Sequence, residues 1–254
     1  MKRIKLVIAY DGTNYCGWQL QPGKPTIEAL LNRALSELLG EEITVIGASR
    51  TDSGVHALGN VAVFDTISRI PAEKIAQAVN QHLPEDIRVQ SSEEAEADFH
   101  PRRCVSRKTY EYRILNRRIA LPTERLYTCF NYYILDVELM QRAAAYLIGE
   151  HDFRSFCSVK TQTKDTVRTI YSLKVDRNGD RITILITGSG FLYNMIRIIA
   201  GTLLEVGRGA YPPEMVKAML SGQNRKLSGP TAPPQGLTLI GIEYSSKEGM
   251  RDDV

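Results

Sequence analysis

The dipeptide Asn178–Gly179 restricts the fold of this chain more than any other short segment. It lies in the turn Arg177–Asn178–Gly179–Asp180, between two strand-like segments at residues 167–175 and 181–187. Asn-Gly favours a tight hairpin turn, because both residues tolerate the positive φ angles that such a turn needs. The sequence therefore predicts two antiparallel strands joined at this point.

Strand and helix patterns alternate irregularly along the rest of the chain. Alternating or β-branched segments predict further strands at residues 3–10, 43–48, 60–65, 86–91, 105–115 and 237–244. Apolar residues at helical spacing predict helices at residues 26–39, 71–82, 137–148, 193–206 and 212–220. Because strict strand–helix–strand alternation is missing, we expect an α+β fold with a mainly antiparallel sheet.

The order of elements is similar in the two halves of the chain, which predicts two related subdomains with a cleft between them. We place them at residues 1–104 and 105–245, with a polar tail at 246–254. A chain of 254 residues with 43% hydrophobic residues can build a core in each half.

The segment from Arg50 to His56 combines a cation, a hydroxyl, a carboxylate, a glycine and an imidazole directly after an apolar run. Asp, Ser and Gly are ordinary turn residues, so this segment is also consistent with a simple turn. A loop between two strands, however, is a common place to present a reactive group. We predict that Asp52 is a catalytic nucleophile.

The predicted helix at residues 193–206 is apolar on nearly every side, yet it contains Arg197. A guanidinium in such a helix is expected to be at least partly buried and then needs an anionic partner. Alternatively, its long side chain reaches solvent. A buried Arg197 would best pair with an acid from another element, whose pKa it would lower.

A basic stripe and two tyrosines suggest contact with RNA. The stripe consists of Arg102, Arg103, Arg107, Lys108, Arg113, Arg117 and Arg118, with Glu111 as its one acid. Tyr110 and Tyr112 share one face of the strand predicted there, where rings could stack on bases and cations could bind phosphates. A solvated strand edge and two core tyrosines explain the same pattern.

Composition excludes several other classes. No apolar run approaches the roughly 20 residues that span a bilayer, and no signal-type stretch follows the basic start, so we expect a cytoplasmic protein. The net charge of +3 is too small to identify a partner. There is no Walker loop. The cysteines form no C-x-x-C pair and the histidines show no zinc spacing, which predicts reduced cysteines and no metal site.

Four segments of the sequence resemble the signature motifs of the tRNA pseudouridine synthase A family. They occur in order at residues 9–19, 50–57, 108–112 and 190–197. The resemblance runs from about residue 4 to residue 244 and is therefore nearly full-length. One position differs from the commonest form of the family, because Ser53 stands where alanine is frequent.

The resemblance implies conversion of uridine to pseudouridine at positions 38, 39 and 40 of the tRNA anticodon stem-loop. It implies the pseudouridine synthase fold, in which two α+β halves share an antiparallel sheet around a central cleft. It also implies a homodimer that uses no cofactor. Position by position, Asp52 matches the catalytic aspartate, Tyr110 the tyrosine that stacks on the target base, and Arg197 the basic partner.

The further candidate substrate contacts are Arg50, His56, Arg102, Arg103 and Lys108. Two rival functions remain open from the residues alone. An RNA-binding module without catalysis would explain the basic and aromatic strand. An aspartate-dependent hydrolase would explain Asp52, although it would usually show a second acid or a metal cluster nearby.

Overall fold

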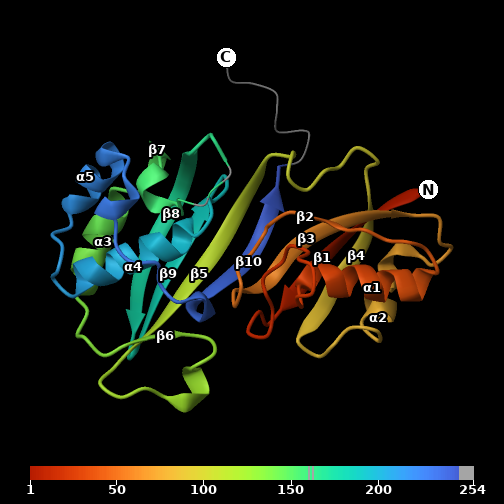
Figure 1. The fold of residues 1–254 in the computed structure, drawn as a ribbon, viewed down its shortest axis with the longest axis horizontal. Coiled ribbons are helices and arrows are strands. Elements are labelled where there is room, and N and C mark those ends of the chain that lie inside the picture. The colour runs from red at the N-terminus through yellow and green to blue at the C-terminus, as the bar shows by residue number, and fades with distance from the viewer. Residues whose placement is uncertain (160, 162, 246–254) are drawn as a thin grey trace. The chain divides into compact units, whose positions relative to one another are not determined.

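A computed structural model describes residues 1–159, 161 and 163–245 (Figure 1). The described residues form two compact units, one comprising residues 1–106 with 239–245 and the other residues 107–238. The boundary expected at 104/105 lies two residues before this division. The last strand, which we assigned to the second half, lies mostly in the first unit. The predicted tail at 246–254 falls outside the described residues.

The first unit is built on antiparallel strands. β1 (Lys2–Tyr10) pairs on one side with β3 (His56–Thr66) and on the other with β4 (Ile87–Ala95). The short β2 (Ile46–Gly47) also pairs with β3, and β10 (Leu237–Tyr244) is the next strand beyond it. Alternate residues of β1 point into the core, as the period of a half-buried strand requires.

Two helices accompany this sheet, α1 (Ile27–Leu39) and α2 (Ala72–Val79), and α2 packs against β4. The ends of α1 follow from local chemistry. The hydroxyl of Thr26 accepts a hydrogen bond from the Ala29 amide at 3.4 Å, which caps the helix start. Gly40 adopts φ 66°, the left-handed conformation that ends many helices. Ile27, Leu31 and Leu35 form the buried face.

The second unit contains the strand order β5–β9–β8–β7. These strands are β5 (Ser106–Asn116), β9 (Arg181–Gly188), β8 (Val167–Asn178) and β7 (Gly149–Asp152), and all three pairings are antiparallel. The short β6 (Cys129–Asn131) runs parallel to β5. The predicted hairpin is present, but its turn residues are Gly179 and Asp180, because Asn178 is the last residue of β8 and pairs with Arg181. Gly179 has φ 57°, whereas Asn178 does not adopt the positive φ that we expected.

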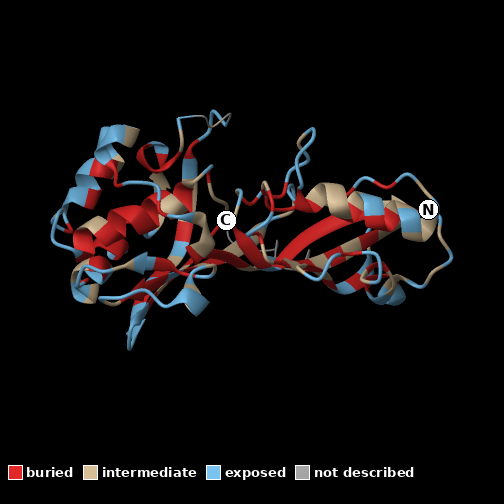
Figure 2. Ribbon diagram, turned by 60° about the horizontal axis from the view of Figure 1, so that its bottom comes forward, coloured by how far each residue is buried: buried red, intermediate tan, exposed pale blue. Residues whose placement is uncertain are grey.

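Three α-helices belong to the second unit: α3 (Val137–Ala145), α4 (Met195–Gly207) and α5 (Met215–Gly222). Short 3-10 helices occur at Pro122–Glu124, Arg154–Phe156, Arg225–Leu227 and Pro234–Gly236. α4 packs against α3, and α3 packs against β8. Buried positions concentrate on the strands and on α4, while the outer helices expose one face (Figure 2). The prediction of an α+β fold with mainly antiparallel strands is confirmed.

The bounds of several predicted elements differ from the structure, as three cases illustrate. The strand expected at residues 43–48 is reduced to Ile46–Gly47. The strand expected from residue 60 begins at His56, because β1 continues to pair with β3 as far as Tyr10 and Ala57. The helix expected to end at Gly149 stops at Ala145, and Gly149, at φ 106°, instead begins β7.

Candidate active site

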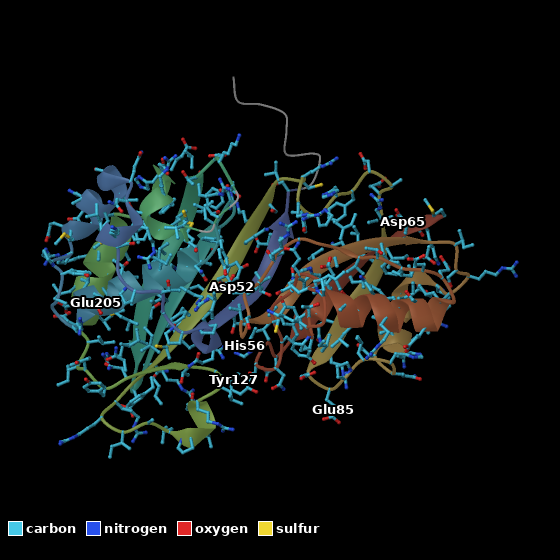
Figure 3. All side chains as sticks on the ribbon, viewed as in Figure 1. Asp52, His56, Asp65, Glu85, Tyr127 and Glu205 are labelled. Atoms are coloured by element: carbon cyan, nitrogen blue, oxygen red, sulfur yellow. The ribbon has the colours of Figure 1, made fainter. Side chains whose placement is uncertain are left out.

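Asp52 lies in the loop that leaves β2 and enters β3, which we call the Asp52 loop (residues 48–55). Figure 3 labels Asp52 and, at the start of β3, His56. Asp52 is half-buried, while its neighbour Thr51 is buried and Arg50 is exposed. The Val55 amide donates to the Asp52 carbonyl at 3.2 Å and closes a tight turn. The turn therefore lies between the buried residues Thr51 and Val55 and carries a carboxylate that is partly exposed.

A second loop, residues 11–18, braces the Asp52 loop through its backbone. The Trp18 amide donates to the Thr51 carbonyl at 3.0 Å. The Tyr15 carbonyl accepts from the Gly54 amide at 3.3 Å and from the Ser53 hydroxyl at 3.1 Å. These bonds satisfy backbone groups on both sides of Asp52, and the Ser53 hydroxyl adds a side-chain bond to the same loop.

His56 is buried and contacts the same bracing loop. Its Nδ1 lies 3.1 Å from the Gly12 amide nitrogen and 3.1 Å from Oδ1 of Asp11. Asp11 Oδ1 also accepts from the Thr13 amide at 2.9 Å, which is the geometry of an Asx turn. The segment Asp11–Thr13 thus orders the loop around the His56 ring.

Arg197 projects from the first turns of α4, in the second unit. Most of α4 is buried, but Arg197 itself is half-buried. Its Nε donates to the Ala232 carbonyl at 2.8 Å, and another guanidinium nitrogen donates to Oδ1 of Asn194 at 2.8 Å. Asn194 precedes the helix in a left-handed conformation, φ 62°. Two neutral acceptors therefore fix the direction of the guanidinium.

Tyr110 and Lys108 lie on β5 of the second unit. The Tyr110 ring is buried and meets the edge of Phe191 with a centroid distance of 5.4 Å. Phe191 belongs to the segment that leads into α4, so Tyr110 lies beside the chain that carries Arg197. Tyr112 is fully buried and donates its hydroxyl to the Pro233 carbonyl at 2.8 Å. The core interpretation therefore holds for Tyr112.

The basic stripe is not uniform. Arg102 and Arg103 are exposed, and their charges, after burial of the ring, lower the pKa of His100 below its usual 6.5. Arg107 stacks over the ring of Tyr171 at 4.9 Å. Arg113 pairs with Glu111, the one acid of the stripe. Arg102, Arg103 and Arg118 are exposed members of the stripe, whereas Arg107 and Arg113 contact other side chains.

All four cysteines are free thiols, and burial raises the pKa of Cys129 and Cys157. Within the described part of the chain, no group of three or more His, Cys, Asp or Glu side chains could hold a metal ion. Over the same residues, none of the helices has both the length and the apolar character needed to cross a membrane.

The first unit carries Arg50 and Asp52 on the Asp52 loop, His56 at the start of β3, and also Arg102 and Arg103. The second unit carries Lys108, Tyr110 and Arg197. Sequence reasoning overlooked the residues that hold these groups, above all Gly17 and Asn194. Both lie inside segments that drew attention for other reasons, and their backbone angles and contacts show what they do.

The chain matches known proteins over nearly its whole length. A family model described as tRNA pseudouridine synthase matches residues 6–102 and 143–245. The tRNA pseudouridine synthase A of Thermoanaerobacter sp. (strain X514) is 48% identical over 244 residues, which cover 96% of this chain and 100% of that relative. The protein of the same name from Brevibacillus brevis is 46% identical with the same coverage. A chain in a solved Cbf5–Nop10–Gar1 complex matches 79% of this chain and 54% of its own length at 14% identity, but its TM-score of 0.34 is too low to support an argument.

Proposed function

Because the chain belongs to the tRNA pseudouridine synthase A family, we propose that it isomerises uridine to pseudouridine at positions 38, 39 and 40 of the tRNA anticodon stem-loop. The observation that carries this proposal is the near full-length match to relatives of that name. The braced loop that presents Asp52 supports it, since a nucleophile must be held in place and remain accessible.

The reaction moves one bond within the substrate. The bond between N1 of uracil and C1′ of the ribose breaks, the base turns, and a bond from C5 to C1′ forms. C5 loses its hydrogen as a proton and N1 gains one, so product and substrate are isomers. The target nucleotide must leave the helical stack before an enzyme group can reach it.

Each candidate residue has a role in this proposal. Asp52 is the nucleophile, and Arg197 is the cation that keeps the carboxylate ionised. Tyr110 stacks on the uracil and retains the base once it is detached. Arg50 and His56 contact the substrate beside Asp52, and the proposed phosphate contacts are Arg102, Arg103 and Lys108.

The proposed context follows from the family. We propose a homodimer that acts in the cytoplasm on tRNA, without a metal ion or other cofactor. Arg197→Met tests the charge partner, because it keeps much of the apolar side chain and removes the charge. We expect this variant to lose most of its activity and to keep its fold, and wild-type activity would refute the pairing.

Mapping of the product tests the substrate assignment. Unmodified tRNA transcripts that carry uridine at only one of the three positions are incubated with the protein, and pseudouridine is then located by nucleotide-resolution sequencing. We expect modification at whichever of positions 38, 39 and 40 holds the uridine. Modification confined to other parts of the tRNA would refute the assignment and would leave the isomerase function intact.

A further inference from the structure

A buried chain of polar side chains leads to the residue before Asp52. The hydroxyl of Tyr10, at the end of β1, lies 2.7 Å from the hydroxyl oxygen of Thr51. The side-chain amide of Asn60, on β3, lies 3.3 Å from the Tyr10 hydroxyl. Tyr10, Thr51 and Asn60 are 4%, 8% and 0% exposed, so water does not compete for these bonds.

The direction of the bonds follows from the surroundings of Asn60. Its Oδ1 accepts from the backbone amides of Ser49 and Val61, at 3.3 and 2.9 Å. Only an oxygen can accept two N–H donors, which fixes the orientation of the amide group. Its Nδ2 then donates to the Ser49 carbonyl at 3.0 Å and to the Tyr10 hydroxyl oxygen. In the bond between Tyr10 and Thr51, either hydroxyl can be the donor.

These contacts fasten the chain just before Asp52. Ser49 is held through both its amide and its carbonyl by Asn60. Thr51 is held through its hydroxyl by Tyr10 and through its carbonyl by the Trp18 amide. The position of the Thr51 backbone sets the direction in which the next side chain leaves the loop.

We propose that Tyr10 is a positioning residue for the reaction: its hydroxyl, oriented by Asn60, holds Thr51 and thereby aims the carboxylate of Asp52. This inference rests on the proposed catalytic role of Asp52. Tyr10 does not touch the substrate in this account. Its removal should slow the chemical step and leave tRNA binding unchanged, because a small displacement of a reacting group greatly reduces the rate.

The test compares Tyr10→Phe, Thr51→Val and the double variant with the wild type. The rate constant for tritium release from [5-³H]uridine tRNA is measured in a single turnover, and the tRNA Kd is measured separately. We expect each single variant to react about 10- to 100-fold more slowly with an unchanged Kd. The double variant should be no slower than either single variant, because both remove the same bond.

Two further variants separate positioning from general stability. Thr51→Ser keeps the hydroxyl, so its rate should lie within about threefold of the wild-type rate, whereas Thr51→Val should show the full loss. Tyr244→Phe removes a hydroxyl that donates to the Pro101 carbonyl at 3.0 Å in the same unit, and it should react at the wild-type rate. Rates are compared well below each variant's Tm.

Each outcome decides the inference. A wild-type rate in a folded Tyr10→Phe variant would overturn it. If Tyr10→Phe does not fold, the two Thr51 variants decide instead, and equal rates for Thr51→Val and Thr51→Ser would overturn it. Losses that multiply in the double variant would also overturn it. If the positioning role of Tyr10 is overturned but Asp52→Asn is inactive in the same assay, the proposed function is unaffected. Full activity of Asp52→Asn would overturn both.

Discussion

Gly17 lies so close to Thr51 that the Thr51 carbonyl oxygen would be 2.6 Å from a β-carbon added to Gly17. The same β-carbon would be 3.1 Å from the carbonyl carbon of Asp52. Gly17 also adopts φ 87°, a conformation that side-chain-bearing residues rarely adopt. The contact couples the bracing loop to the backbone of the candidate nucleophile.

We expect Gly17→Ala to displace the Asp52 loop, because the obstructing atoms are backbone atoms and cannot rotate away. The rate of pseudouridine formation should fall by at least about tenfold, as a displaced nucleophile predicts. Gly23→Ala is the matched control, since Gly23 has φ 68° but no atom within 4 Å of an added β-carbon. Both variants incur backbone strain of about 1–2 kcal/mol. Equal activity of the two variants would contradict the account.

Asn194 is expected to matter through the direction of Arg197. Asn194→Gly preserves the left-handed backbone and removes the acceptor of the 2.8 Å bond, so the rate should fall while the Tm changes little. Asn194→Asp keeps an oxygen in place and should retain more activity than Asn194→Gly. Gln223→Gly, at the other left-handed non-glycine position among the described residues, serves as the control for the backbone effect. If both glycine variants are fully active, Asn194 does not position Arg197.

Arg102 and Arg103 should contribute to tRNA affinity by neutralising phosphates. Each change to alanine should weaken binding and reduce the slope of log Kd against log salt by about 0.7–0.9 for each phosphate that is no longer neutralised. Arg33→Ala changes the net charge equally, but Arg33 lies exposed on α1 and faces Glu37 at 3.9 Å. That control should leave the slope unchanged. If the slope is unaltered in the Arg102 and Arg103 variants, these two residues belong to a solvated surface that does not contact the tRNA phosphates.

The titration of His100 reports on the same two cations. Burial lowers its pKa first, and the charges of Arg103 and Arg102 lower it further. Arg103→Ala should therefore raise the pKa of His100 toward 6.5, as followed by an NMR pH titration, and Arg33→Ala should not. Because the folded-state pKa is lowered, the contribution of His100 to stability is present above pH 6.5 and decreases as the pH falls below it. If the pKa of His100 does not change in Arg103→Ala, the Arg103 guanidinium does not lie close to the His100 ring.

Local signals in the sequence determine much of the fold. Thr26 and Gly40 bound α1 within one residue of the ends predicted at 26 and 39, and a hairpin forms where Asn178–Gly179 predicted one, because caps and tight turns depend on neighbouring residues. Elements whose ends depend on distant partners are less predictable. β3 extends back to His56 because Tyr10 of β1 pairs with Ala57, a contact across 47 residues.

The same distinction applies to the candidate site. Asp52 and Arg197 stand out because their chemistry is unusual for their surroundings. Tyr10 reads as an ordinary strand residue, and its hydroxyl bond to Thr51 spans 41 positions of the sequence. One local signal was available: Asn60 directly precedes the apolar run from Val61 to Phe64, and an amide that is buried with such a run requires partners.

Tritium release from tRNA labelled at uridine C5 is the most direct test of the central claim, which is isomerisation through Asp52. The wild-type protein is compared with Asp52→Asn and with Asp65→Asn, a control carboxylate in the same unit that pairs with Arg3 at 2.7 Å. We predict release by the wild type and by Asp65→Asn, and none by Asp52→Asn despite unchanged tRNA binding. Release by Asp52→Asn at the wild-type rate, or none by the wild type with tightly bound tRNA, would contradict the account.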